Sequence, residues 1–249
     1  MKQTPATIIN RDAKSVLSPL ETLVAEDIAR FGSLVPSGNH ERIVSPLFVS
    51  SLCAFLSLLV EENARVNLTA NAEPRVVLER HIHDSLAPLL VNVAQPRCLL
   101  DIGSGGGFPA VPLALAWPET AVTLVESIGK KARFLQHVVD VIPLPRTTLL
   151  AQRIERSEGI SRSFFDMITA RGVASIETLY DYALPLLAPG GKLVMWKGER
   201  DLAVLEEPRF SARMREAHCT PSVLAYRLPG IERRSMLVIL QVAPNGTRK

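Results

Sequence analysis

The residues best suited to chemistry lie between positions 99 and 109. Asp101 ends an apolar run, and a glycine-rich turn that includes Gly103 and Gly105 follows it. Glycines let a turn adopt positive φ and let a ligand approach the backbone. Free N–H groups at the start of the next helix bind polar or anionic groups. The segment therefore predicts a ligand-binding strand–turn–helix junction.

Three residues favour S-adenosylmethionine over a dinucleotide as this ligand. The dinucleotide fingerprint needs a glycine where this chain has Phe108. The Asp101 carboxylate would repel a phosphate, whereas it suits the ammonium of methionine, directly or through water. Glu126 follows 25 residues later at the end of a second apolar run, where a carboxylate accepts hydrogen bonds from ribose hydroxyls. A nucleotide-binding module without methyl transfer, or a turn that only packs, remains an alternative.

The segment after the fourth predicted strand bears on the methyl acceptor. Residues 165–172 contain neither an Asn-Pro-Pro-aromatic loop, typical of adenine amine methylation, nor a Pro-Cys nucleophile. The three cysteines, Cys53, Cys98 and Cys219, occupy no strand-to-helix turn, so covalent catalysis is not expected. A guanine N7 loses no proton on methylation and needs only alignment with the methyl group. O-methylation assisted by a distant residue stays open.

Two cations follow apolar strands directly. Arg171 and Lys197 stand at the carboxyl ends of strands, where open α/β folds bind ligands, and are predicted to be functional. Asn67 either contacts the target base or cofactor or belongs to a structural loop. His81 and His83 face different directions on a helix, so we expect no shared metal ion.

The pattern of apolar residues predicts the elements that position these side chains. Residues 1–96 are predicted to be a helical extension that packs on the core, with helices over 18–31, 46–62 and 73–91 and a loop at 36–38. From residue 97 to 249, strand-length and helical segments alternate, which predicts a parallel sheet with helices on both faces. The predicted strands span 98–102, 121–126, 147–151, 165–170 and 192–196, followed by an antiparallel pair at 222–228 and 235–242.

Composition excludes several classes of protein. The 249 residues are 47% hydrophobic and 21% charged, as in globular proteins and unlike disordered chains. Three scattered cysteines exclude a disulfide scaffold and fit the cytoplasm. The N-terminus lacks a secretory apolar region, and residues 45–60 are predicted to be a core helix rather than a membrane span. Residues 97–249 carry a net charge of +5 against −2 for residues 1–96, which fits a polyanionic partner.

The chain resembles the bacterial 16S ribosomal RNA guanine-N7 methyltransferase family, the glucose-inhibited division protein B group. The resemblance covers residues 50–242 and rests on several ordered motifs: Asn-Leu-Thr at 67–69, Glu-Arg-His-Ile-His-Asp-Ser-Leu at 79–86, the turn at 101–109, Glu-Ser at 126–127, Gly-Lys-Lys at 129–131, Arg-Ile-Glu at 153–155, Thr-Ala-Arg-Gly at 169–172 and Lys-Gly at 197–198. Ala110 stands where the family usually has glycine, and Glu62 where it has tryptophan.

The resemblance implies a Rossmann-like class I methyltransferase that forms 7-methylguanosine in 16S rRNA of the small ribosomal subunit. By position, Gly103 and Phe108 would line the cofactor pocket, Glu126 would bind the ribose, and Ile154 with Glu155 would border the adenine. Arg171 would reach the cofactor or the target. A cytoplasmic monomer without metal or membrane attachment is expected. A methyltransferase for a small molecule or a protein is the alternative.

Overall fold

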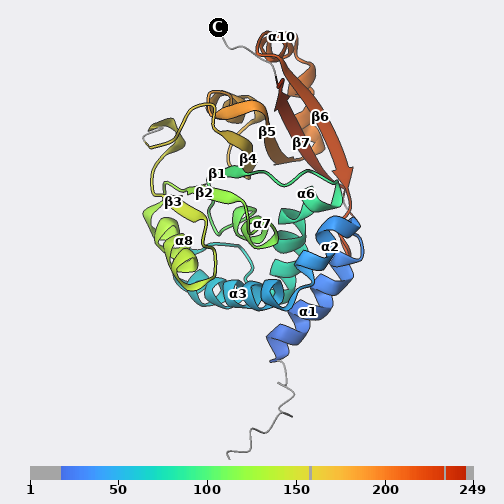
Figure 1. Cartoon of the computed structure of the whole chain (residues 1–249), viewed down its shortest axis with the longest axis vertical. Helices are drawn as coiled ribbons and strands as arrows, with labels where there is room; N and C mark the ends of the chain where they lie inside the picture. Colours follow the sequence, from blue (N-terminus) through green and yellow to red (C-terminus); the bar gives the residue numbers. More distant parts are fainter. Residues whose placement is uncertain (1–17, 157–158, 233, 245–249) are drawn as a thin grey trace, which may run out of the picture.

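The computed structural model describes residues 18–156, 159–232 and 234–244 of the chain. The N-terminal segment, which we predict to carry no secretory signal, lies outside them up to residue 17. The described residues form a seven-stranded sheet of order β3-β2-β1-β4-β5-β7-β6 (Figure 1). Its strands are β1 (Cys98–Ile102), β2 (Ala121–Val125), β3 (Thr147–Leu150), β4 (Phe165–Arg171), β5 (Leu187–Lys197), β6 (Cys219–Tyr226) and β7 (Ser235–Val242).

Strands β1 to β5 are parallel, and β7 runs antiparallel to both β5 and β6. Three crossover helices, α7 (Ala110–Ala116), α8 (Gly129–Val141) and α9 (Ile176–Ala183), connect the parallel strands. The predicted α/β, doubly wound fold is therefore confirmed, and so is the antiparallel pair that ends the chain.

The N-terminal part is helical, as predicted, but two of its details differ from the prediction. Its elements are α1 (Pro19–Gly32), α2 (Ser37–Ile43), α3 (Pro46–Val66), α4 (Pro74–Val77), the π-helical turn Leu78–Ile82, α5 (His83–Ser85) and α6 (Ala87–Leu90). The loop predicted at residues 36–38 is wrong, since α2 begins at Ser37 directly after Pro36. The continuous helix predicted over 73–91 is interrupted, because the π turn and Pro88 break the regular hydrogen-bond ladder.

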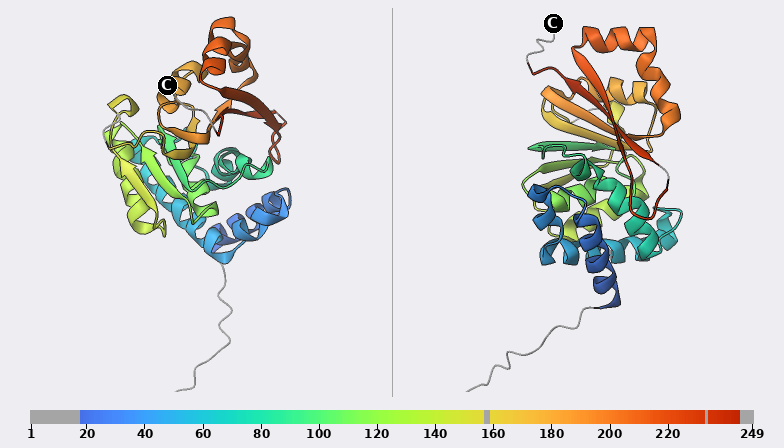
Figure 2. Two further views of the ribbon diagram at one scale, coloured as in Figure 1. Left: turned by 45° about the horizontal axis from the view of Figure 1, so that its top comes forward. Right: turned by 90° about the vertical axis from the view of Figure 1, so that its right-hand side faces the viewer.

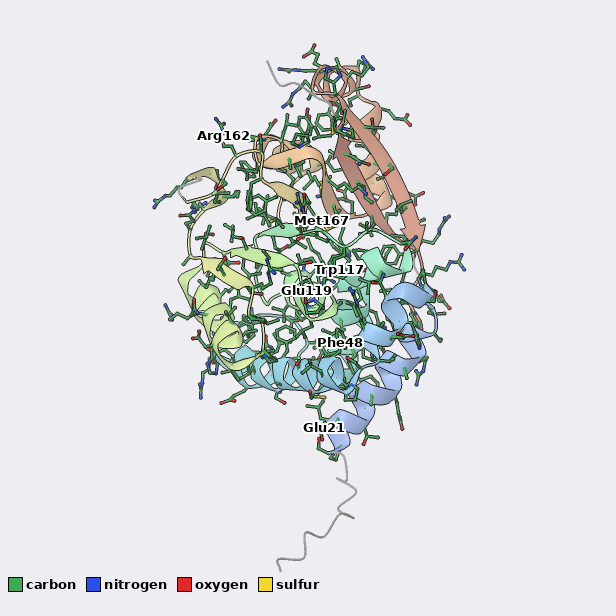
Figure 3. All side chains as sticks on the ribbon, in the orientation of Figure 1. Glu21, Phe48, Trp117, Glu119, Arg162 and Met167 are labelled. Carbon is green, nitrogen blue, oxygen red and sulfur yellow. The ribbon has the colours of Figure 1, made fainter. Side chains whose placement is uncertain are left out.

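The longest helix, α3, packs against the crossover helices α7 and α8. By length and composition it could cross a membrane. Its buried residues, among them Leu52 and Leu59, nevertheless belong to the core that also holds strand residues such as Leu99. Phe48 of α3 and Trp117, both labelled in Figure 3, belong to the same core. Helices of the N-terminal part and strands of the sheet thus share one hydrophobic cluster. A second cluster fills the opposite face of the sheet, under α9.

The C-terminal part extends the sheet beyond β5. A 3-10 helix (Glu199–Glu206) and α10 (Pro208–Glu216) follow β5, and α10 was not predicted from the sequence. Strand β6 begins at Cys219, three residues before the predicted start. Figures 1 and 2 show α10 and α1 at opposite ends of the molecule, with β6 and β7 running down the side from α10 toward the N-terminal helices.

Candidate functional site

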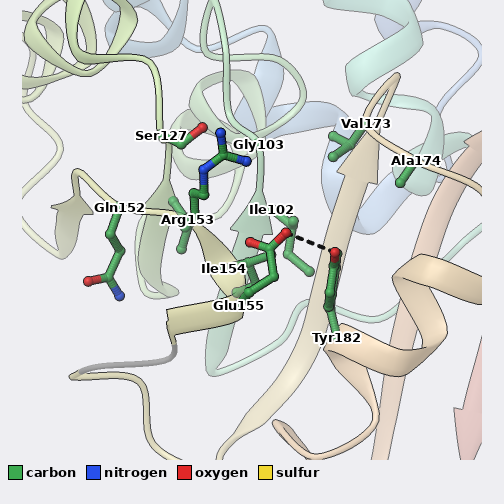
Figure 4. Close-up of a pocket in the computed structure, with 11 residues that line it drawn as sticks. Ile102, Gly103, Ser127, Gln152, Arg153, Ile154, Glu155, Val173, Ala174 and Tyr182 are labelled. Atoms are coloured by element: carbon green, nitrogen blue, oxygen red, sulfur yellow. Dashed lines mark hydrogen bonds between the residues drawn. The ribbon is translucent and has the colours of Figure 1, made fainter.

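A cavity of about 240 Å³ lies at the carboxyl ends of β1, β2 and β4 (Figure 4). The predicted site residues Gly103, Ile154 and Glu155 line it. The remaining lining residues are Ile102, Val125, Ser127, Gln152, Arg153, Val173, Ala174 and Tyr182. Of these, Ile102, Ser127 and Arg153 belong to motifs named above. The rest belong to no such motif, and Val125 ends β2 while Tyr182 lies in α9.

The glycine turn forms one wall of this cavity. Gly103 has a φ of +71°, and its N–H donates to the carbonyl of Val125 at 2.8 Å. A side chain here would meet Val173, because a Cβ would stand 2.7 Å from Cγ2 of that residue. Both the conformation and the close approach therefore require glycine.

Glu126, which directly follows β2, stabilises the glycine turn through hydrogen bonds. Its carboxylate accepts a hydrogen bond from the N–H of Gly105 at 2.8 Å and another from the N–H of Ile128 at 2.7 Å. Glu126 and Gly105 do not line the cavity themselves. Each carboxylate oxygen keeps a second lone pair, so these bonds leave Glu126 able to accept from a ligand hydroxyl.

Asp101 is buried beneath the turn and is only 1% exposed. Its Oδ1 accepts a hydrogen bond from the Thr169 hydroxyl at 2.6 Å, whereas its Oδ2 has no hydrogen-bond partner among the described residues. Burial raises the pKa of this carboxyl to about 7. A buried acceptor without a donor is costly, and a cation or N–H donor from a ligand would satisfy it.

Glu155 and Tyr182 close the opposite side of the cavity. The Tyr182 hydroxyl donates to Glu155 Oε1 at 2.9 Å (Figure 4). Backbone and Tyr182 hydrogen bonds lower the pKa of Glu155 below its usual range. Ile154 is buried, which gives the cavity an apolar floor next to this polar rim. An apolar floor with polar groups at the rim suits a purine nucleoside.

Arg171 ends β4 outside this cavity, and its guanidinium is held on two sides. Nε lies 2.8 Å from Oδ2 of Asp84, and Nη2 donates to the Arg80 carbonyl at 3.0 Å. Asp84 is fixed in turn by the Tyr226 hydroxyl and, through its carbonyl, by Trp196 Nε1 at 2.7 Å. Residues from the N-terminal helices, β5 and β6 therefore fix one side chain.

His81 joins this network from the other side. Nη2 of Arg171 lies 3.2 Å from its Nδ1, and its Nε2 lies 3.0 Å from the Thr69 hydroxyl. Burial and the Arg171 charge lower the pKa of His81 to about 4. The neutral ring accepts from Arg171, donates to Thr69, and stacks on Phe108 with ring centroids 5.0 Å apart. Phe108 thus supports the network and does not line the cavity.

The remaining predicted site residues lie around the same edge. Lys197 ends β5, and its Nζ donates to the carbonyl of Ala174. Asn67 is exposed at the end of α3 with a φ of +59°. The Asn63 side chain holds the Asn67 loop by accepting from the N–H groups of Leu68 and Thr69 at 2.7 and 2.8 Å. Within the described residues, no group of three or more metal-ligating side chains occurs.

Comparison with known sequences identifies the family. The family model for rRNA small subunit methyltransferase G matches residues 49–225. A protein of this name from Chloroflexus aggregans is 38% identical over 233 residues, 92% of each chain. One from Roseiflexus castenholzii is 41% identical over 187 residues, 73% of this chain and 78% of that protein. The chain belongs to the rRNA small subunit methyltransferase G family.

Solved structures similar to this methyltransferase G family member share its fold. A putative O-methyltransferase from Klebsiella pneumoniae superposes with a TM-score of 0.56 at 19% identity, over 90% of this chain and 99% of that one. An O-methyltransferase from Bacillus cereus in complex with SAH gives a TM-score of 0.52 at 20% identity, over 76% and 90%. At such identities the likeness speaks for the fold.

The methyltransferase G match begins inside α3 and so includes most of that helix, the glycine turn and the Arg171 network. The boundary that we predict at residue 96 therefore does not coincide with the start of the family match. The division into an extension and a methyltransferase domain stays a prediction.

Proposed function

We propose that this protein transfers a methyl group from S-adenosylmethionine to N7 of a guanosine in 16S rRNA. One observation carries the proposal. In a chain of the methyltransferase G family, a nucleoside-sized cavity adjoins a glycine turn. Beneath that turn lies the buried Asp101 carboxyl group, one oxygen of which has no hydrogen-bond partner among the described residues. The acceptor follows from the family resemblance, since N7 is the atom that the resemblance implies.

The chain's own residues fit the cofactor. The apolar floor at Ile154 and the rim at Glu155 suit the adenine, and Glu126 suits the ribose hydroxyls. The unpartnered Oδ2 of Asp101 suits the ammonium of methionine, bound directly or through a water molecule. When bound, S-adenosylmethionine supplies an electrophilic methyl group on a sulfonium.

The protein's contribution to the reaction is alignment. N7 of guanine attacks with a lone pair and releases no proton, so no general base is needed. His81 is neutral and occupied on both ring nitrogens, which suits a structural task. We assign Arg171, Lys197 and Asn67 to the acceptor side, where Arg171 and Lys197 would position the nucleotide and Asn67 would contact it.

We further propose that the protein acts as a cytoplasmic monomer, without a metal ion or membrane attachment. The burial of one face of α3 in the core supports the part of this proposal that concerns the membrane. Small ribosomal subunits or their 16S rRNA are the proposed partner.

The decisive experiment uses labelled S-adenosylmethionine and small subunits that lack native N7 methylation, followed by nucleoside analysis. We expect 7-methylguanosine at one site. Arg171→Ala should lower kcat/KM about 100-fold, since misplacing reacting groups by about 1 Å has that effect. The matched control is Arg146→Ala, an exposed arginine before β3 at the opposite edge of the sheet. Methylation of a different atom, or full activity of Arg171→Ala, would contradict the assignment.

A further inference from the structure

A second cavity, of about 250 Å³, adjoins the segment that follows β4. Val173 and Ala174 of this segment line the first cavity, whereas Arg171 lines the second together with Lys197. Lys197, which lines the second cavity, donates a hydrogen bond to the carbonyl of Ala174, which lines the first. Arg234, which directly precedes β7, and Ser235, the first residue of β7, also line the second cavity.

The charges around this cavity do not balance. Asp84 is the carboxylate in its lining, and that group is already paired with Arg171 and bonded by the Tyr226 hydroxyl. Lys197 and Arg234 have no carboxylate partner within 4.0 Å in the described parts of the chain. Two positive charges are therefore left over in the lining.

Lys197 shows this imbalance most clearly. The side chain is half-buried, and its ammonium bonds to one neutral carbonyl. Burial lowers the pKa of Lys197, and this effect outweighs the opposing influence of the Asp201 charge, which makes no ion pair with it within 4.0 Å. An ammonium has three donors, so two of them are available to a ligand. Such a site is completed by an anion.

We infer that the second cavity binds a backbone phosphate of the substrate RNA beside the target nucleotide; this inference rests on the proposed function. A third cavity, of about 560 Å³, shares Asp84, Ile231 and Ser235 with the second and is lined further along by one cation, Arg80, and one carboxylate, Glu232. The two form a continuous groove, which fits a strand better than a single free ion. Arg–phosphate and Lys–phosphate contacts position a nucleic acid without reading its sequence.

The chemistry of the reaction favours a phosphate over the base as the ligand of these cations. A guanidinium or ammonium that donated to N7 would occupy the lone pair that attacks the methyl group. Cations bound to the neighbouring phosphate hold the nucleotide and leave N7 free. The carboxylate of the cofactor's methionine is the other anion available, and the test separates it from phosphate.

The test measures binding of S-adenosylmethionine-loaded protein to undermethylated small subunits over a range of salt concentrations. Each lost phosphate contact should make the slope of log K against log[salt] less steep by about 0.7 to 0.9. We expect this change in Lys197→Met and in Arg234→Gln, with affinity about tenfold lower at moderate salt. Arg146→Gln removes a charge at the opposite edge of the sheet and should leave the slope unchanged.

Cofactor affinity, measured by calorimetry, identifies the anion. Unchanged affinity for S-adenosylmethionine together with the altered slope supports a phosphate site. A parallel loss of cofactor affinity would overturn the inference in favour of the methionine carboxylate, and wild-type slopes in both variants would overturn it outright. Because Arg234 is exposed, its substitution spares the core and keeps the test valid if Lys197→Met is unstable. Failure of the proposed function shows separately, as absence of 7-methylguanosine from wild-type reactions.

Discussion

At the scale of single residues, the Asp101 carboxyl makes cofactor binding depend on pH. Burial raises its pKa to about 7, and a bound ammonium would favour the ionised form and lower that pKa. Binding should therefore release a proton, and the affinity for S-adenosylmethionine should fall as pH drops below about 7. We expect a loss approaching tenfold per pH unit.

Calorimetry between pH 6.0 and 7.5 checks this prediction. Asp101→Asn serves as the control, because an amide keeps the shape and cannot titrate. The variant should bind more weakly and with a flat pH profile over the same range. An unchanged pH dependence in Asp101→Asn would assign the titration to another group.

The buried pair of Asp27 and His83 yields a prediction about stability. Oδ2 of Asp27 lies 2.6 Å from Nε2 of His83. The Phe31 ring stacks on the imidazole, with the two ring centroids 4.7 Å apart. Asp27→Ala leaves a buried nitrogen without a partner, so we expect a loss of about 1–3 kcal/mol in the free energy of unfolding.

Chemical denaturation measures that loss. Asp27→Asn retains an oxygen acceptor at the same place and should lose less than the alanine variant. Equal losses for the two substitutions would show that packing, and not the hydrogen bond, sets the cost. His83 directly precedes Asp84, so the contact with Asp27 connects α1 to the segment that carries the carboxylate partner of Arg171.

At the scale of elements, substitutions of glycine separate two causes of strain, namely a positive φ and a close contact with a side chain. Gly103→Ala meets both a positive φ and the Val173 side chain, whereas Gly230→Ala meets a φ of +73° with nothing within 4 Å of the new Cβ. We expect Gly103→Ala to destabilise by about 1–3 kcal/mol and Gly230→Ala by less.

The double variant Gly103→Ala/Val173→Ala tests the contact directly. Removing the valine methyl groups should restore part of the loss in thermal unfolding and leave the part that is due to φ. No restoration would mean that backbone strain alone explains why glycine is required. Cofactor affinity of the same variants shows whether the turn keeps its shape.

The sequence predicts secondary structure well where apolar residues recur with a clear period. It predicts poorly where a helix buries few residues or is interrupted. All seven strands were expected, because apolar runs of strand length alternate with helical patterns. Helix α10 was missed, since it buries only Phe210 and Met214 and otherwise reads as a polar loop. The interruption at residues 78–82 was also missed, because a π turn leaves no mark on apolar spacing.

The candidate site was predictable only in its local part. The turn from Asp101 to Phe108 and the cations that end β4 and β5 are readable from strand ends and spacing. Tyr226 was not, because it meets Asp84 across 142 positions of sequence. The structure also gives Phe108 a different neighbourhood, since its partners His81 and Phe55 come from helices whose placement no local pattern fixes.

At the scale of the whole molecule, the cations gather where the parallel strands end. Arg171, Lys197 and Arg234 reach one groove from β4, β5 and the loop before β7. The net charge of +3 is too small to hold RNA by itself, so local arrangement matters more than the total. The salt-slope experiment above is a test of that arrangement.

The strand order has a consequence for the synthesis of the protein. Strand β7 follows β6 in the chain, yet it lies between β5 and β6 in the sheet. Strand β6 therefore has no strand to pair with until β7 has been made, and Tyr226 cannot take its final position against Asp84 before then. The Arg171 network is therefore completed only after β7 has been made, so a nascent chain that stops before Ser235 lacks the Tyr226 contact that fixes Asp84.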